Sequence, residues 1–354
     1  MSELLDFGGH PLWTNAAVFA VSAAIVWAVG TRMVRLVDRL ADRTGMGKGF
    51  AGMLLLGGIV SLTEISTVSS AAFTGSPLLA LNNLLGSESI NLFLLAAVDP
   101  LSGREALTSF IARPTMLFQG TVGIVLLAVA AVAMAVGDML VLGVGLWSTA
   151  LFLLCLGALW LSARYERRTV WIAFDRHDQD AEEETASEAE GRGDSILLLW
   201  GKLLLMGAVI FAAGFTLSLT GEALAEQTGL GTSFVGFLLV GISTSLPELS
   251  TITAAIRLGR HEMAVGDILG SNVFNLLLIF LTDVVYVGEP VFNMVGRFEV
   301  VASLLGILMT GILLLGLLER WDRTLLGMGY DSAALIAVFI GGVGLLYGLG
   351  AGGG

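Results

Sequence analysis

The chain has 354 residues, of which 55% are hydrophobic and 14% are charged, and its mean hydropathy is +0.86. A soluble domain carries about 25% charged residues, so this composition excludes a soluble globular protein and indicates several membrane-spanning segments. The net charge of −12 says little about a partner, because much of it lies in the single stretch Asp175–Asp194.

Ten apolar segments are predicted to cross the bilayer as helices, so the expected fold is an all-α polytopic membrane protein. Each segment has the roughly 20 residues that such a helix requires. In chain order they lie near residues 12–31, 50–74, 78–98, 115–136, 139–162, 196–219, 231–256, 262–282, 298–318 and 331–350.

The loop between the fifth and sixth segments, residues 164–195, is the main polar region of the chain. Its stretch DRHDQDAEEETASEAEGRGD has too few apolar residues to fold by itself, so we expect a disordered linker. The stretch also lacks the ligand spacing of an EF-hand, which argues against a dedicated regulatory calcium site.

The basic residues predict how the ten segments are oriented. Seventeen of the 18 Lys and Arg residues fall in or beside the loops on one side, and Arg297 is the exception. The positive-inside rule assigns that side to the cytoplasm. We therefore expect a multi-pass protein of the cell (plasma or inner) membrane, with both termini extracellular and loop 164–195 cytoplasmic.

An internal repeat is the most specific feature of the sequence. With a shift of 184 residues, Gly57–Asp99 aligns with Gly241–Asp283 without a gap, and 16 of the 43 positions are identical. Because the second and seventh segments run in opposite directions, the two copies are related by inversion in the membrane plane. Inverted repeats with a binding site at the midplane are typical of transporters. Seven of the identities are polar: Ser61/Ser245, Glu64/Glu248, Ser66/Ser250, Thr67/Thr251, Ser87/Ser271, Asn91/Asn275 and Asp99/Asp283.

The polar residues of each repeat are spaced to face one centre. Gly57, Ser61 and Glu64 lie at i, i+4 and i+7, and so share a helical face. Carboxylate, hydroxyl and amide oxygens are the ligands of hard cations, and broken helices can add backbone carbonyls. A carboxylate at the bilayer centre costs at least roughly 2.5–3.5 kcal/mol, so two of them predict a bound cation or protons. The same pattern recurs in Gly241, Ser245 and Glu248, and the adjacent segments add the pairs Ser87/Asn91 and Ser271/Asn275.

Other shared residues carry weaker signals. Ser66/Ser250 and Thr67/Thr251 are expected to bond back to their own helices. Asp99/Asp283 fit equally a helix cap and an interface position. Glu88 follows Ser87 and either adds charge to the site or faces a portal.

The motifs SLPELST (245–251) and GDILGSNVFN (266–275), with SLTEIST and LLGSESIN in the first half, resemble the calcium/cation antiporter superfamily, and in particular prokaryotic sodium/calcium exchangers. The resemblance implies ten transmembrane helices in two inverted five-helix repeats. It divides the chain into an N-terminal half, 1–163, with a first alpha-repeat at about 50–99; the acidic loop 164–195; and a C-terminal half, 196–354, with a second alpha-repeat at about 234–283. The cation-binding residues that it implies are Gly57, Val60, Ser61, Glu64, Ser87, Asn91, Gly241, Thr244, Ser245, Glu248, Ser271 and Asn275.

The first repeat departs from the family pattern. Thr63 stands where the family has Pro, Glu88 where it has the Asn of GSN, and Val60 where it usually has Thr. Both Asn91 and Asn275 are neutral, so a third central carboxylate found in some relatives is missing at these positions. Ion choice and stoichiometry therefore stay open.

The function implied is secondary antiport, with Na⁺/Ca²⁺ exchange first and Ca²⁺/H⁺ exchange as the alternative. A cation channel is less favoured, although pores also use repeats and oxygen ligands. An enzyme is not expected, because Ala264–Asp267 falls short of a Gly-x-Gly-Asp motif and His261-Glu262 lacks a second zincin His. The expected partners are inorganic cations and the lipid bilayer, with no organic cofactor and no nucleic acid.

Overall fold

The computed structural model describes residues 7–103, 105–111, 114–166, 195–227, 235–319, 324–325 and 327–351. Most of the acidic loop 164–195, the start of the predicted segment 231–256, and Arg104, Arg113, Arg320 and Arg323 lie outside these residues. Nine helical segments of the described chain are long and apolar enough to cross a membrane. The predicted all-α polytopic membrane fold is confirmed.

The first half begins with the short turn η1 (Phe7–Gly9) and the 33-residue helix α1 (Leu12–Thr44), which ends at Gly45 in the left-handed conformation that favours glycine. A broken run follows: α2 (Lys48–Ala51), the π-helical turn η2 (Gly52–Leu56), α3 (Gly57–Val60) and α4 (Leu62–Phe73). Helix α5 (Pro77–Val98) starts on a proline, whose missing N–H is not needed in a first turn. The half closes with η3 (Asp99–Ser102), η4 (Leu107–Phe110), α6 (Pro114–Val136), the hairpin β1 (Leu140–Val141) and β2 (Val144–Gly145), and α7 (Leu146–Glu166).

The second half repeats this order. It consists of α9 (Ile196–Glu226), η5 (Val235–Val240), α11 (Gly241–Thr244), α12 (Leu246–Arg257), α13 (His261–Val285), η6 (Val291–Asn293), α14 (Arg297–Glu319), the hairpin β3 (Thr324–Leu325) and β4 (Met328–Gly329), and α15 (Tyr330–Ala351). The shift of 184 residues carries the first residue of α1, α3, α4, α5, α7 and both strands of the first hairpin onto its counterpart. The repeat therefore extends over nearly the whole of each half.

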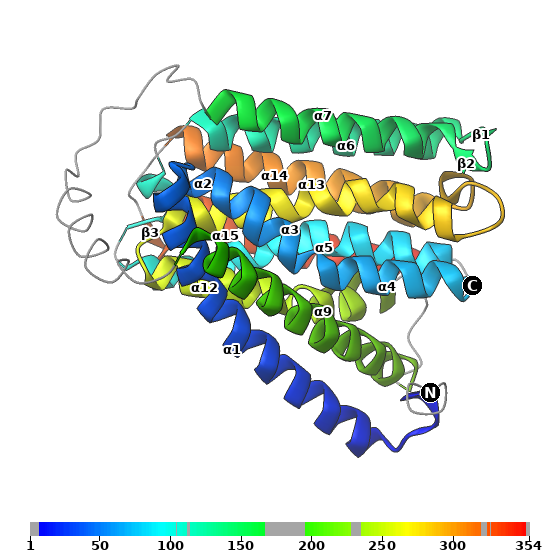
Figure 1. Ribbon diagram of the computed structural model, residues 1–354. Coiled ribbons are helices and arrows are strands. Elements are labelled where there is room, and N and C mark those ends of the chain that lie inside the picture. Colours follow the sequence, from blue (N-terminus) through cyan, green and yellow to red (C-terminus); the bar gives the residue numbers. More distant parts are fainter. Residues whose placement is uncertain are drawn as a thin grey trace.

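The two halves run in opposite directions. Helix α1 runs toward the end of the molecule at which α7 stops, and α9 runs back from that end (Figure 1). The equivalent hairpins β1–β2 and β3–β4 lie at opposite ends of the bundle (Figure 1). These hairpins were not predicted; each pairs two residues with two, with Leu140 opposite Gly145 and Thr324 opposite Gly329.

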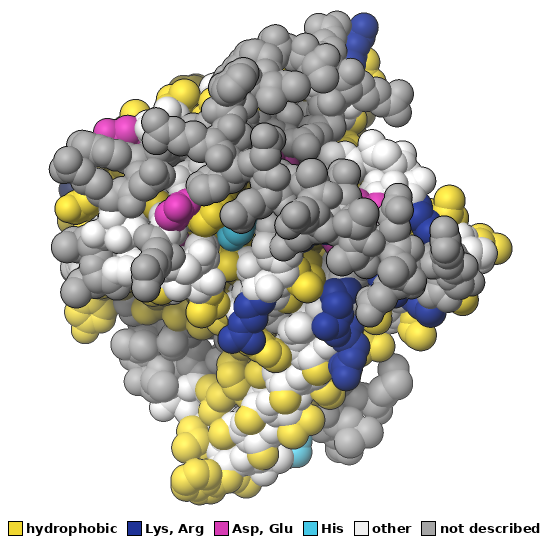
Figure 2. All heavy atoms as spheres, turned by 90° about the vertical axis from the view of Figure 1, so that its left-hand side faces the viewer, with side chains coloured by type: hydrophobic (Ala, Val, Ile, Leu, Met, Phe, Trp, Pro, Cys, Tyr) yellow, Lys and Arg dark blue, Asp and Glu magenta, His cyan; other side chains and the backbone are white. Residues whose placement is uncertain are grey.

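The end of the bundle where α1 and α12 finish, and where α2 and α13 begin, is called the basic end below. Lys and Arg side chains gather on it (Figure 2). Asp38 of α1 pairs there with Lys48 (2.7 Å) and with Arg260 at the start of α13 (2.9 Å). These pairs connect α1 to two helices of the central bundle.

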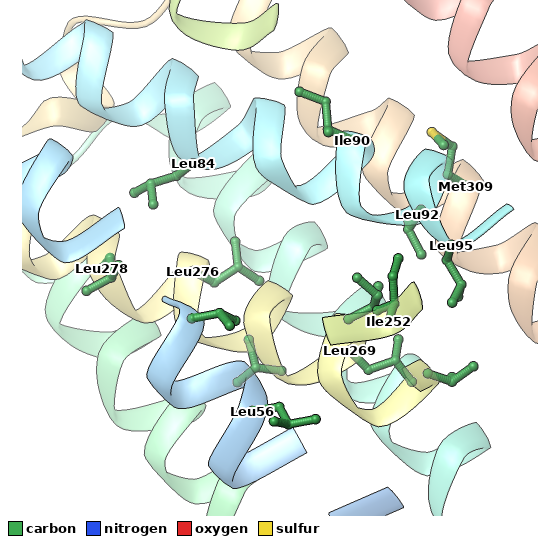
Figure 3. Packing of buried hydrophobic residues seen from close by; sticks show 14 of the residues in the cluster. Leu56, Leu84, Ile90, Leu92, Leu95, Ile252, Leu269, Leu276, Leu278 and Met309 are labelled. Atoms are coloured by element: carbon green, nitrogen blue, oxygen red, sulfur yellow. The ribbon is translucent and has the colours of Figure 1, made fainter. Parts of the chain in front are cut away.

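The core is formed mainly by α4, α5, α12 and α13, where few side chains reach the surface. Leu84 and Ile90 from α5, Ile252 from α12 and Leu276 from α13 are almost completely buried (Figure 3). Helices α1 and α9 pack against each other along one flank of this core (Figure 1). The segments predicted at 12–31 and 196–219 are longer than expected, because the helices continue to Thr44 and Glu226.

Candidate cation-binding site

Two helix breaks position the predicted glutamates. The helical run stops at Ser61 (ψ −4°) and at Ser245 (ψ 6°), and a new helix begins at the next residue. Glu64 and Glu248 thus lie in the first turn of α4 and α12, where free backbone N–H groups and the helix dipole favour a negative charge. The short helices α3 and α11 begin at Gly57 and Gly241, four residues before these breaks, and Pro247 lies in the first turn of α12.

Glycines let each broken helix cross the intact helix of the other half at backbone contact. A Cβ atom on Gly270 would lie 2.2 Å from the carbonyl oxygen of Met53 in η2, and one on Gly86 would lie 2.0 Å from that of Phe237 in η5. A Cβ on Gly57 would lie 2.8 Å from the backbone nitrogen of Ser271. The two halves therefore interlock. The serines that follow Gly86 and Gly270, Ser87 and Ser271, come to lie next to the helix breaks of the opposite half.

The carboxyl groups of Glu64 and Glu248 meet between the two breaks. Both residues are 0% exposed, and their carboxyl groups are close enough to interact directly. The Thr63 hydroxyl lies 2.8 Å from Oε2 of Glu64. The other oxygen of Glu64 and both oxygens of Glu248 have no hydrogen-bond partner among the described residues.

Buried polar atoms without partners recur near the two breaks and on the helices α5 and α13 that cross them. Buried polar atoms in proteins are almost always hydrogen-bonded, and leaving one unpaired costs about 1–3 kcal/mol. Several such atoms from both repeats at one place indicate a ligand site rather than a packed core. Within the described chain they are the Oγ atoms of Ser61, Ser245 and Ser271, Oδ1 of Asn91, and Oδ1 and Nδ2 of Asn275.

The remaining predicted ligands lie at the same place but already have protein partners. Oγ of Ser87 is 3.3 Å from Oγ1 of Thr244, which also reaches Oδ1 of Asn83 at 3.2 Å. The carbonyl of Val60 accepts a hydrogen bond from Thr63 (2.9 Å), and that of Gly241 accepts one from Thr244 (3.1 Å). A carbonyl oxygen has two lone pairs, so the carbonyl of Val60 keeps one for a cation. The carbonyl of Gly241 also accepts the backbone nitrogen of Ser245 (3.0 Å), so a cation would have to replace one of its two donors.

Three other sets of residues are now placed. Thr67 and Ser250 bond back to their own helices, to Thr63 (3.0 Å) and Pro247 (2.7 Å), as expected. Asp99 accepts hydrogen bonds from the backbone nitrogens of Leu107 and Gly329, both at 2.6 Å. Because Gly329 belongs to the second half, Asp99 has a structural role in connecting the two halves. Glu88 is 2% exposed, and its Cβ lies close to Gly306 of α14.

Asp267 is a buried acid that the sequence analysis did not include in the site. It is 0% exposed and interacts electrostatically with both Glu64 and Glu248. In the first repeat the equivalent position is occupied by Asn83, so Asp267 is not among the residues that the two repeats share. The signal that finds it is its spacing: Asp267 lies four residues before Ser271 and eight before Asn275, on the same face of α13.

These features together suit a hard cation. Two carboxylates buried side by side without a positive partner are unfavourable, because neither hydration nor an ion pair offsets their charges. Hydroxyl, amide and carbonyl oxygens from both repeats offer the mixed oxygen set that such ions bind. Among the described residues, no three acidic, histidine or cysteine side chains converge on one point.

Comparison with known proteins gives the family. Residues 14–163 and 198–348 match the family described as sodium/calcium exchanger protein, once in each half of the chain. The chain belongs to this family. It is accordingly a cation antiporter and a multi-pass membrane protein.

Several relatives share this likeness over much of their length. The inner membrane protein YrbG of Escherichia coli is 27% identical over 74% of this chain and 77% of its own. The putative antiporter CaxA of Alkalimonas amylolytica is 24% identical over 90% of this chain and 93% of its own. A solved structure of the sodium-calcium exchanger NCX_Mj, soaked with Na⁺ and Sr²⁺, superposes with a TM-score of 0.68 at 17% identity, covering 94% of this chain and 99% of that one. This last match supports the exchanger fold.

Proposed function

We propose that the protein exchanges Na⁺ for Ca²⁺ across the membrane, with the transported ion held between Glu64 and Glu248. The observation that carries the proposal is the pair of mirrored, fully buried carboxyl groups, together with the buried oxygens of both repeats that have no hydrogen-bond partner in the described part of the chain. Two carboxylates balance one Ca²⁺ or two Na⁺, so either cargo neutralises the site. Competition between the two ions for the same oxygens would couple their movements.

Each predicted ligand has a distinct role in this proposal. Glu64 and Glu248 supply the charge, and the hydroxyls of Ser61, Ser245, Ser87, Ser271 and Thr244 replace water around the ion. Asn91 and Asn275 add amide oxygens without charge. Gly57, Val60 and Gly241 contribute carbonyls.

Alternating access is assigned to α1 and α9. These two helices pack on each other and form one flank of the core (Figure 1). Movement of this pair along α4 and α12 would open the site to one side at a time, while the interlocked α5 and α13 stay fixed. The ion pairs of Asp38 at the basic end would have to adjust during this movement.

The basic end is assigned to the cytoplasm, because Lys and Arg collect there. A membrane-impermeant maleimide tests this in a Cys155→Ala background, since Cys155 is the single cysteine of the chain. Ser195→Cys, beside the start of α9, should be labelled only from the cytoplasm. Leu142→Cys, at the fully exposed tip between β1 and β2, should be labelled only from outside. The reverse pattern overturns the orientation.

The exchange itself is tested by uptake of labelled calcium into inverted membrane vesicles. One set carries an outward sodium gradient across the vesicle membrane, and a matched set carries an outward proton gradient. Acceleration by sodium supports the proposal. Acceleration by protons alone would replace it with Ca²⁺/H⁺ exchange, an alternative favoured by Val60, which offers no hydroxyl to a sodium ion. Calcium flux that needs neither gradient would indicate a channel.

A further inference from the structure

We propose that Asp267 forms a second cation subsite beside the Glu64/Glu248 pair and that it takes a monovalent cation, Na⁺, during exchange. This inference rests on the proposed function, because it assigns the extra charge to transport. It concerns an acid that has no counterpart in the first repeat.

Asp267 has one protein partner for its two oxygens. Its Oδ2 accepts a short hydrogen bond from the hydroxyl of Thr251, and its Oδ1 has no partner in the part of the chain that the structure describes. The Thr251 hydroxyl also lies 3.0 Å from the carbonyl oxygen of Glu248, and it has a single hydrogen for both acceptors. A fully buried carboxyl group with at most one such bond must be neutralised, either by a proton or by a bound cation.

The subsite is distinct from the central pair. Asp267 interacts with Glu64 and Glu248 through space, yet the three acids do not converge on one ion among the described residues. A Ca²⁺ ion between the glutamates would leave the charge of Asp267 uncompensated. A single monovalent cation bound by Oδ1 of Asp267 and the hydroxyl of Thr251 would balance it.

Asp267 lies on one side of the central pair. Asp267 precedes Ser271 by four residues on α13, and α13 begins at the basic end. Asp267 is therefore about 6 Å nearer to the basic end than Ser271 is. Thr251 follows Glu248 on α12, which finishes at the same end. The mirrored position is occupied by neutral Asn83, whose Oδ1 accepts a hydrogen bond from Thr244. A cation that enters from the basic end thus meets a third carboxylate, and one that enters from the other end does not.

A binding measurement on the purified full-length protein tests the subsite without transport. The melting temperature is followed in detergent as NaCl replaces choline chloride at constant ionic strength. In the variant Glu64→Gln/Glu248→Gln, which lacks the central charges, a sodium-dependent rise should remain. Adding Asp267→Asn should reduce that rise by about fivefold or more, because a ligand stabilises only the state that binds it.

A matched control is Asp283→Asn, which removes a different buried acid from the same helix. It should lower the melting temperature in choline and leave the sodium-dependent rise unchanged. If the triple variant with Asp267→Asn does not fold, Thr251→Val in the same background should raise the half-saturating sodium concentration by about threefold or more, since it removes one oxygen ligand. Absence of a sodium response in Glu64→Gln/Glu248→Gln, or an unchanged response after Asp267→Asn or Thr251→Val, would overturn the proposal.

The transport assay separates this inference from the proposed exchange. If sodium gradients fail to drive calcium uptake by the native protein, the exchange proposal falls, and the melting experiment still decides the subsite. If exchange occurs, Asp267→Asn should raise the half-activating sodium concentration at the basic end by about tenfold, the effect of losing one charged contact worth about 1.4 kcal/mol. Sodium activation from the other side should stay within about twofold of the native value. Equal changes on both sides would contradict a one-sided subsite.

Discussion

Thr63 Oγ1 lies 2.8 Å from Oε2 of Glu64 and 2.9 Å from the carbonyl oxygen of Val60. In the second repeat the position of Thr63 is occupied by Pro247, which has no hydroxyl to offer Glu248. The two glutamates of the site therefore occupy equivalent positions in the repeats, but only Glu64 has a hydroxyl group on the preceding residue. Oε2 of Glu64 accepts a hydrogen bond from the adjacent Thr63, whereas neither oxygen of Glu248 has a hydrogen-bond donor of this kind among the described residues.

Thr63→Val should weaken calcium binding, because it removes the donor that orients Glu64 and stabilises its charge. Loss of one hydrogen bond to a charged group is worth about 1.5–3 kcal/mol, so the half-saturating calcium concentration should rise by about tenfold or more. Labelled calcium uptake over a range of concentrations measures this. Thr63→Ser keeps the hydroxyl and should stay close to the native value; equal loss in both variants would assign the effect to packing.

Asp99 should matter for stability and not for ion binding. Its two oxygens accept the backbone nitrogens of Leu107 and Gly329, so Asp99→Asn leaves one of these donors without an acceptor. The free energy of unfolding should fall by about 1–3 kcal/mol, seen as a lower melting temperature in detergent. The protein that folds should keep its calcium affinity. A normal melting temperature with lost transport would show that Asp99 has a role in the transport cycle.

Gly270→Ala should disrupt the crossing of α13 with η2. The new Cβ would lie 2.2 Å from the carbonyl oxygen of Met53, a backbone atom that cannot turn aside, and overpacking of this kind costs about 1–3 kcal/mol or more. The yield of monodisperse protein and its melting temperature should both drop. Gly157→Ala on α7 is the matched control, since a Cβ there meets nothing within 4 Å. Similar losses in both variants would contradict the close contact.

Much of the architecture could be predicted because the repeat preserves its spacing. The residues Ser61, Glu64, Ser245 and Glu248 align at a shift of 184, and the structure starts α4 and α12 at the same shift. Identity of polar residues in an apolar chain is a strong signal, since each buried polar side chain carries an energetic cost that needs a reason.

Other features could not be predicted, because they depend on contacts between distant segments. The breaks fall at equivalent residues, Ser61 and Ser245, although only the second repeat has a proline nearby, so the proline alone does not determine their position. Asp99 accepts a hydrogen bond from the backbone nitrogen of Gly329, which lies 230 residues later in the chain, and no spacing rule identifies such a partner. Asp267 was missed for a different reason, since the comparison of repeats rewards symmetry and this acid departs from it.

The central claim is that Glu64 and Glu248 hold the transported ion. Glu64→Gln and Glu248→Gln keep size and shape, and each removes one charge from a fully buried pair. Without cations, the melting temperature of each variant should equal or exceed the native value, because a costly buried charge is gone. Sodium-driven uptake of labelled calcium into inverted vesicles is the decisive measurement. It should be abolished in both variants, and normal uptake by both would contradict the site.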